Sequence, residues 1–263
     1  MTDKRMKLVE PVLNTIENDD IREFAVVLLD SLPEYIWTVP ASSTGKYHPA
    51  YSLGDGGLMR HQMAVVRFLN FFFELEQYNS KLTSREMDLM RVAGLVHDGM
   101  KSGSQEQFSN SKYTKFEHPM LMAIKVRETT GYLPENELEV IADSISKHMG
   151  QWNTDKKSSI TLPKPSDKFS RMLHVADYLA SRKSLTMDFD DYVVAPPVKT
   201  EWDESYVMPF GKYAGQKLID VYKVRPDYVE WMEKNISKPD VLNMIKLMKK
   251  SLKNGGSNEQ VAN

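Results

Sequence analysis

The sequence predicts a mainly α fold, in which a helical bundle is followed by a small α+β module. Apolar residues recur at helical spacing through most of residues 1–187, and Pro and Gly separate the apolar runs. Beyond a Pro-bearing acidic stretch, short extended and helical patterns alternate around turn glycines. Hydrophobic residues make up 41% of the 263 residues and charged residues 27%, which is a globular composition and excludes a disordered chain.

The first predicted elements are two amphipathic helices and one buried helix. Apolar positions at helical spacing predict helices over 6–16 and 21–28. Residues 38–57 contain four glycines and predict an exposed loop. Apolar side chains are so dense over 58–76 that this helix is expected to be buried on most sides.

The later helices are bounded by capping and breaking residues. Thr83 and Glu86 have the spacing of a capping box and open a helix that ends near His97. The polar residues 99–117 predict a loop, and Pro119 suits the first turn of the helix after it. The helices expected beyond this loop cover 118–130, 134–149 and 166–183.

Charge and proline content change along the sequence and divide the chain into an N-terminal domain, a linker and a C-terminal module. Residues 188–204 hold six acids, one base and a Pro-Pro pair, which is typical of a linker. Residues 206–253 hold ten bases and five acids, a net charge of +5 in a chain of net charge −2. The expected organisation is a domain over 1–187 (N-terminal helices and loop 1–56, main bundle 57–187), an acidic linker 188–205, a basic module 206–253 and a disordered tail 254–263.

Charge and cysteine content exclude several classes of protein. A net charge of −2 argues against coating nucleic acid through bulk charge. The absence of cysteine excludes a disulfide scaffold, a thiolate zinc site and a cysteine nucleophile, so a metal would need His and carboxylate ligands. We expect a cytoplasmic protein with no membrane partner, because no run approaches the ~18 apolar residues of a membrane span. The oligomeric state stays open.

Four of the six histidines and one aspartate lie where predicted helices begin or end, and a second aspartate lies within a predicted helix. Helix ends aimed into one cavity can supply nitrogen and oxygen ligands to a divalent metal. A single histidine on an amphipathic helix is more often an ordinary core or surface residue. The ordered set is harder to attribute to chance, and Asp177 lies among apolar residues where burial is costly without a cation. The candidate metal ligands are His61, His97, Asp98, His118, His148 and Asp177.

These residues resemble the HD superfamily of metal-dependent phosphohydrolases. The three segments that carry the resemblance read GGLMRHQMAV, AGLVHDGMK and MLHVADYLA. They match the signature of His, then His-Asp, then a distal Asp on a helical bundle. Gly99-Met100-Lys101 stands where the family usually has Ile-Gly-Lys, which leaves the lysine in register. The additional His118 and His148 are similar to the subset of the family that holds two metals.

The resemblance implies a two-metal centre. Two cations ~3.5–4 Å apart can clamp the attacking and departing oxygens of a displacement at phosphorus. Mn²⁺ is the first expectation, with Co²⁺, Ni²⁺, Fe²⁺, Zn²⁺ and Mg²⁺ as alternatives. Lys101 is expected beside a phosphate oxygen, as a catalytic residue together with Asp98, or else as an ordinary surface lysine. The implied ligand sets are His61, His97, Asp98 and Asp177 for the first metal, and Asp98, His118 and His148 for the second.

Two further resemblances point to nucleic acid. The segment KYHPAYSLGDGGLMRH looks most similar to bacterial HD-type 3′→5′ exoribonucleases, although we expect no counterpart of their amino-terminal OB domain in these 263 residues. The segment YVMPFGKYAGQKLIDVYKVRPDYVEWMEKN is similar to the Pro-Phe-Gly-Lys-Tyr-x-Gly module of some exodeoxyribonuclease X-type proteins. Its lysines and aromatics suit a nucleic-acid backbone and its bases, and the alternative is a module that only docks on the first domain.

Four residues near the predicted ligands are candidates for substrate binding besides Lys101. His48 and Tyr51 could stack on a base, unless their loop packs on its own aromatics. Arg60 and Arg182 could contact phosphate, although basic residues in such places are more often solvated.

The function expected first is a metal-dependent phosphodiesterase that hydrolyses nucleic acid, with 3′→5′ exonuclease action as one form. The second is an HD-type phosphohydrolase acting on mononucleotides or cyclic dinucleotides. The third is a non-catalytic nucleic-acid-binding protein with a vestigial metal site. A polymer needs an open groove, whereas a nucleotide can be held in a closed pocket.

Overall fold

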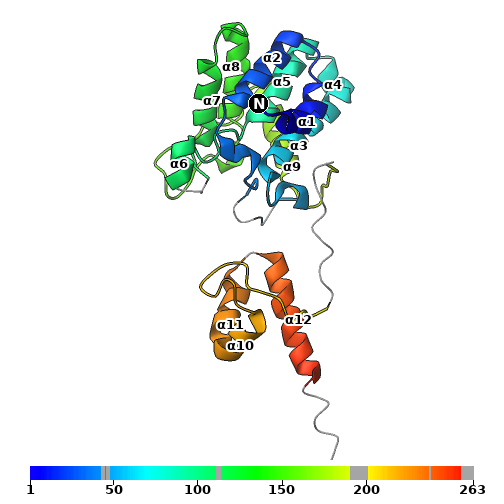
Figure 1. The fold of residues 1–263 in the computed structure, drawn as a ribbon. Coiled ribbons are helices and arrows are strands. Elements are labelled where there is room, and N and C mark those ends of the chain that lie inside the picture. The colour runs from blue at the N-terminus through cyan, green and yellow to red at the C-terminus, as the bar shows by residue number, and fades with distance from the viewer. Residues whose placement is uncertain (43–44, 46–47, 111–113, 190–200, 237, 256–263) are drawn as a thin grey trace, which may run out of the picture. The chain divides into compact units, whose positions relative to one another are not determined.

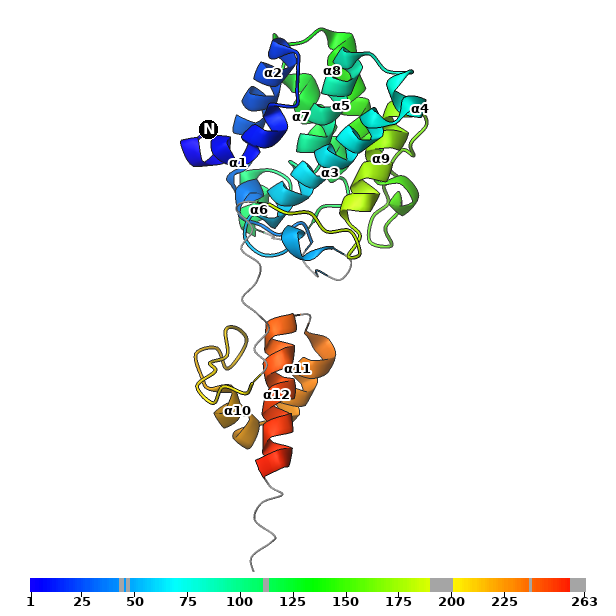
Figure 2. The same cartoon turned by 90° about the vertical axis from the view of Figure 1, so that its right-hand side faces the viewer.

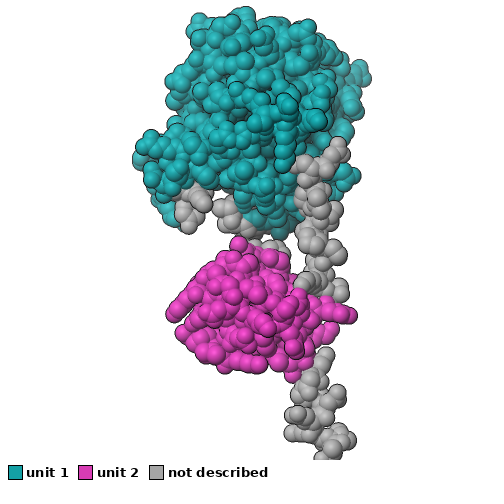
Figure 3. All heavy atoms as spheres, in the orientation of Figure 1, with its two compact units in different colours: residues 1–192 teal, residues 193–263 magenta. Residues whose placement is uncertain are grey.

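The computed structural model describes residues 1–42, 45, 48–110, 114–189, 201–236 and 238–255. It divides into two compact units, residues 1–192 and 193–263 (Figure 3). Unit 1 contains α1 (Asp3–Leu13), α2 (Asp19–Asp30), η1 (Glu34–Trp37), η2 (Ala50–Ser52), α3 (Gly57–Glu74), α4 (Glu76–Asn79), α5 (Ser84–Val96), α6 (Gln105–Asn110), α7 (His118–Glu128), α8 (Glu135–Ser146), η3 (Gly150–Trp152) and α9 (Lys168–Ala180). Unit 2 contains α10 (Leu218–Val224), α11 (Pro226–Asn235) and α12 (Pro239–Gly255).

Helix α3 runs through the middle of unit 1. It packs against α5 and α9, while α7 and α8 form a helical pair beside α5 (Figures 1 and 2). The contact of α3 with α5 depends on Gly94, because a Cβ there would lie 2.8 Å from Cδ1 of Leu69 and 3.3 Å from Cγ1 of Val65. A larger residue would push the two helices apart. The expectation of a buried helix after residue 57 is confirmed.

Capping residues fix where the helices begin. The Thr83 side chain accepts from the backbone N–H of Glu86, and the Glu86 carboxylate accepts from the backbone N–H of Thr83, so the expected capping box is confirmed. Asp167 caps α9 by accepting from the backbone N–H groups of Phe169 and Ser170. These caps fix the first turns of α5, which ends just before His97, and of α9, which carries Asp177.

Two predicted loops contain helical turns. In the stretch expected to be exposed, η2 is inserted and buries Tyr51 and Ser52 against the core. In the second loop, α6 begins where Ser104 and Gln107 exchange hydrogen bonds between side chain and backbone. Both segments are short, so helical periodicity could not reveal them.

Unit 2 is a small helical unit with its own core, formed by residues such as Leu218, Val229 and Ile245. The mainly α fold class is confirmed, but the expected β part of this module is wrong. In the described residues of unit 2, extended chain forms a single bridge, from Val207 to Lys217. Pro209 lacks a donor for a longer ladder, and the chain turns at glycines with positive φ. Residues 190–200 of the expected linker and 256–263 of the expected tail lie outside the described part.

No helix among the described residues is long and apolar enough to span a membrane.

Candidate metal centre

The six residues singled out as metal ligands come together from five places in unit 1. They are His61 on α3, His97 and Asp98 at the end of α5, His118 at the start of α7, His148 just after α8, and Asp177 on α9. All four imidazoles and Asp98 are buried, whereas the Asp177 side chain keeps 22% of its surface exposed.

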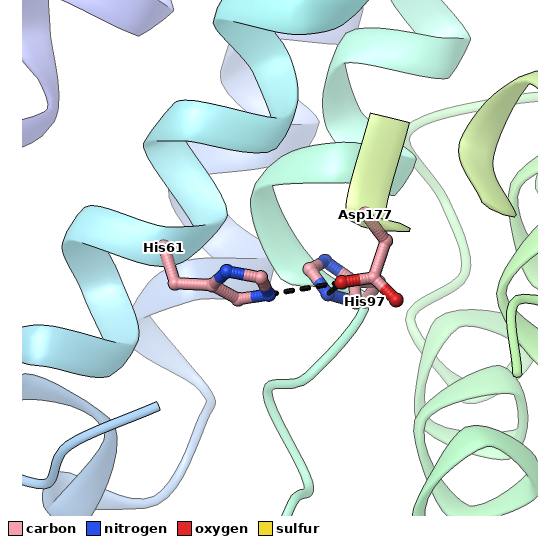
Figure 4. A group of neighbouring side chains, drawn as sticks. All are labelled: His61, His97 and Asp177. Atoms are coloured by element: carbon pink, nitrogen blue, oxygen red, sulfur yellow. Dashed lines mark ion pairs between the residues drawn. The ribbon is translucent and has the colours of Figure 1, made fainter. Parts of the chain in front are cut away.

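The first group is formed by His61, His97 and Asp177 (Figure 4). Nε2 of His61 lies 3.0 Å from Oδ1 of Asp177, and Nε2 of His97 lies 3.7 Å from the same oxygen. The two ring centroids are 5.4 Å apart. One donor atom from each residue therefore faces a common point.

Asp98 connects this group to a second one. Its Oδ1 lies 3.0 Å from Nε2 of His118 and 3.7 Å from Nε2 of His148. Its Oδ2 lies 3.7 Å from Nε2 of His97. The donor atoms of His97, Asp98 and His148 all lie within 4.8 Å of one another. The two oxygens of Asp98 thus face opposite halves of one cluster.

Backbone carbonyls orient three of the four imidazoles. Nδ1 lies 2.9 Å from the Gly94 oxygen in His97, 2.7 Å from the Lys115 oxygen in His118, and 2.8 Å from the Ile145 oxygen in His148. A carbonyl oxygen only accepts, so each Nδ1 carries a proton and donates it. In the neutral ring, Nε2 is then left with a lone pair directed into the cluster, as in many metal-binding histidines.

The cluster contains buried polar atoms that no group among the described residues satisfies. Nε2 of His97, Oδ1 of Asp98 and Nε2 of His118 have no hydrogen-bond partner within the described part of the chain. Leaving buried polar groups unpaired costs about 1–3 kcal/mol each. Divalent cations bound in the cluster would satisfy these atoms, and imidazole and carboxylate are suitable ligands for Mn²⁺, Fe²⁺ or Zn²⁺. The residues present therefore fit a metal centre.

Both carboxylates are ionised. Burial raises the pKa of Asp98, but Lys101, His97 and His118 outweigh it and hold the pKa well below its usual value. Burial likewise opposes ionisation of Asp177, and His61 and His97 hold the pKa of this carboxyl well below its usual value. The centre thus provides anionic oxygen ligands at neutral pH.

The histidines respond to the same environment in different ways. Burial, followed by His97 and His118, lowers the pKa of His148 to about 3, so this ring is neutral. Burial also lowers the pKa of His97, but Asp98 and Asp177 outweigh it and the net pKa is raised. Among these two rings, His97 is the one that competes for a proton when no metal is bound.

A cavity of about 520 Å³ opens onto the cluster. His48, Lys101 and Arg182 line it, together with ligands of both groups. Lys101 donates from Nζ to Oδ2 of Asp98, so it is not an ordinary surface lysine. Burial, followed by His61 and Lys101, lowers the pKa of His48 to about 3, so this ring is neutral.

Two residues expected to bind substrate have structural roles instead. Tyr51 is buried and its hydroxyl donates to the Ala180 carbonyl at 3.0 Å, so its ring cannot stack on a base. Arg60 is also buried, and its guanidinium donates to the carbonyl oxygens of Leu53 and Asp55, so it holds the preceding loop rather than a phosphate.

Sequence reasoning missed Trp152, which lines the cavity, and Tyr178, which stacks against it. Tyr178 directly follows Asp177, so adjacency to a predicted ligand was the available signal. Trp152 follows His148 by four residues in a stretch without helical periodicity, and only the folded chain brings it to the cavity.

The fold and the site define a helical domain with a His/Asp centre suited to divalent metal. Residues 59–182 match the family model described as HD domain, and this stretch includes all six candidate ligands. This stretch of the chain is therefore similar to the HD domain, and the helical fold and the His/Asp cluster agree with that similarity. No curated protein and no solved structure matches the chain significantly.

Proposed function

We propose that this chain is a metal-dependent phosphodiesterase that hydrolyses nucleic acid, with 3′→5′ exonuclease action as its specific form. The observation that carries the proposal is the convergence of six His and Asp side chains, Asp98 among them, in the stretch that matches the HD-domain model. The choice of nucleic acid and the 3′ polarity rest on the resemblance of residues 46–61 to HD-type exoribonucleases.

The chemistry divides between the cation and the chain. Divalent cations held by the six ligands would supply Lewis acidity, which would polarise a phosphoryl oxygen and make water a competent nucleophile near neutral pH. Asp98 remains ionised and holds its two oxygens toward the two groups of imidazoles. Lys101 lines the cavity and is placed to donate to a phosphoryl oxygen as negative charge develops. No protein nucleophile is required.

Unit 2 supports a polymeric substrate. Residues 206–253 carry a net charge of +5, which favours a phosphate backbone. The Lys238 ammonium lies 4.3 Å from the Phe210 ring centroid, and Tyr228 stacks on Trp231, which is 53% exposed. Exposed aromatics beside cations are typical of surfaces that bind single strands.

A second candidate function is hydrolysis of free nucleotides. The cavity volume of about 520 Å³ lies within the roughly 300–1,000 Å³ of small-molecule sites, so one nucleotide fits it. This observation favours a nucleotide at the centre but does not distinguish a free nucleotide from the end of a strand.

A substrate panel tests the proposal. The protein is incubated with Mn²⁺ and labelled single-stranded RNA, single-stranded DNA, nucleoside phosphates or cyclic dinucleotides, with Asp98→Asn as the control for contaminating activity. We expect a strand to be shortened from its 3′ end by the wild type alone. Hydrolysis of nucleotides only would establish the second candidate, and binding without any hydrolysis would indicate a vestigial site.

Deletion of residues 206–263 tests the role of unit 2. The two units have separate hydrophobic cores, so unit 1 keeps its own core in the shortened chain. The deletion should lower kcat/KM for a strand more than for a small phosphodiester such as bis(p-nitrophenyl) phosphate. Equal losses on both substrates would contradict a role in capturing the polymer.

A further inference from the structure

Trp152 and Tyr178 form an aromatic shelf at the rim of the cavity. Their ring centroids are 5.9 Å apart and their planes differ by 14°, so the rings are stacked. Trp152 lines the cavity that contains the metal cluster, and it keeps 45% of its surface exposed despite this stacking. Tyr178 is 37% exposed. A large flat apolar surface thus remains available next to the candidate metal centre.

The shelf is fixed relative to the metal ligands. Gly150 lies between His148 and Trp152 with φ +58°, and a Cβ there would lie 2.1 Å from the His174 ring. His174 donates from Nδ1 to the His148 carbonyl at 2.8 Å, and its ring centroid is 6.1 Å from that of Trp152. The turn that carries Trp152 is therefore held by the same contacts that hold the backbone of His148.

Positive charge lies beside the shelf. The Arg182 guanidinium is 4.3 Å from the Tyr178 ring centroid, and Arg182 also lines the cavity. A guanidinium over an aromatic ring presents a second flat, cationic surface, which favours a ligand that is both planar and anionic. A nucleotide combines a planar base with an anionic phosphate.

We infer that Trp152 stacks on the nucleobase of the nucleotide whose phosphate lies at the metal centre. The inference rests on the proposed function, because it takes the phosphate to be bound by the His/Asp cluster. Stacking recognises the flat face that every base presents, so Trp152 strengthens binding of any nucleotide without selecting one base. Trp152 acts through binding and takes no part in proton transfer.

Matched substrates test this role by kinetics. One oligonucleotide carries a normal 3′-terminal nucleotide, and the other carries an abasic residue at the same position. Trp152→Ala should lower kcat/KM roughly 5- to 150-fold on the normal strand, the range expected for one stacked base, and leave the abasic strand unaffected. Trp152→Phe should restore most of the loss. Phe71→Ala, which removes an exposed aromatic outside the cavity, is the control. Equal losses on both strands would overturn the inference.

Binding gives a second, independent readout. Nucleoside 5′-monophosphate and ribose 5-phosphate are titrated into the Mn²⁺-loaded full chain, and tryptophan fluorescence is recorded. We expect the nucleotide to quench the fluorescence of the wild type and ribose 5-phosphate to leave it unchanged. Trp152→Phe should lose the quenching by the nucleotide. Equal quenching in both proteins would overturn the inference. If the wild type cleaves no strand but shows this quenching, the proposed function fails while the stacking assignment stands.

Discussion

Nε2 of His118 lies 3.0 Å from Oδ1 of Asp98, and both atoms are buried with no hydrogen-bond partner among the described residues. Nδ1 of His118 donates to the Lys115 carbonyl, so in the neutral ring Nε2 carries a lone pair. Two buried acceptors at this separation repel each other unless a positive charge lies between them. That charge is a proton or a metal cation, and the nearby Nε2 of His148, 3.7 Å from the same oxygen, supplies a further metal ligand.

Removal of His118 should abolish metal binding in one half of the centre and leave the other half intact. His118 contacts Asp98 but is not part of the group formed by His61, His97 and Asp177. We expect His118→Ala to bind one Mn²⁺ per chain where the wild type binds two, as measured by equilibrium dialysis and elemental analysis. Asp143→Asn is the control, because Asp143 pairs with Lys147 and is not one of the six candidate ligands. Two ions bound to His118→Ala would refute this division.

Gly150→Ala should destabilise the turn after His148. The φ of +58° strains any residue with a Cβ, and the new Cβ would collide with the His174 ring. Gly131→Ala is a matched control, because Gly131 has φ +91° and a Cβ added there would meet nothing within 4 Å. Overpacking typically destabilises a protein by about 1–3 kcal/mol. In urea unfolding, we therefore expect Gly150→Ala to lower the free energy of unfolding by that much more than Gly131→Ala does. An equal loss of stability in the two variants would show that the collision with the His174 ring contributes nothing and that backbone strain alone destabilises them.

The metal-free protein should lose stability in acid through His148. The pKa of this ring is about 3 when folded, against an ordinary value of 6.5. Between these values the unfolded chain binds a proton that the folded chain does not, so the free energy of unfolding decreases as pH falls from 6.5 towards 3. The raised pKa of His97 acts in the opposite direction, and Asp98 and Asp177 add to the loss only at lower pH.

Urea unfolding in the presence of a chelator measures this effect. The free energy of unfolding is measured for the wild type and for His148→Asn at about pH 7 and at about pH 5. The ring of an ordinary histidine changes charge between these two pH values. The variant should lose less stability between the two pH values than the wild type. An equal or larger loss in His148→Asn would show that His148 is not the group responsible.

The ligand set was predictable because helix-end histidines and an acid among apolar residues are visible in the sequence. His97-Asp98 follows a helix opened by a recognisable capping box, and Asp177 stands within an apolar stripe. The residues that line the substrate cavity were harder to predict from the sequence. Tyr51 and Arg60 have the side chains of ligand-binding residues, but their hydroxyl and guanidinium groups satisfy backbone carbonyls.

Tertiary contacts determine the features that the sequence did not reveal. The approach of α3 to α5 at Gly94 and the stacking of Trp152 on Tyr178 join segments far apart in the chain. The extended pattern around Pro209 suggested strands, but the folded chain keeps one bridge there. Local periodicity therefore predicted the helices, and helix ends indicated the candidate ligands, but neither could predict which aromatic side chains would surround them.

The most direct measurement of the metal centre is the Mn²⁺ content of wild type and Asp98→Asn after equilibrium dialysis. Asp98 contacts both groups of imidazoles, so its replacement should reduce bound Mn²⁺ from two ions per chain to one or none, and lower hydrolytic activity roughly 10³-fold. Asp143→Asn alters a carboxylate paired with Lys147 outside the cluster and should retain both ions. A wild type that binds no Mn²⁺, or an Asp98→Asn protein that binds as much as the wild type, would contradict the metal centre.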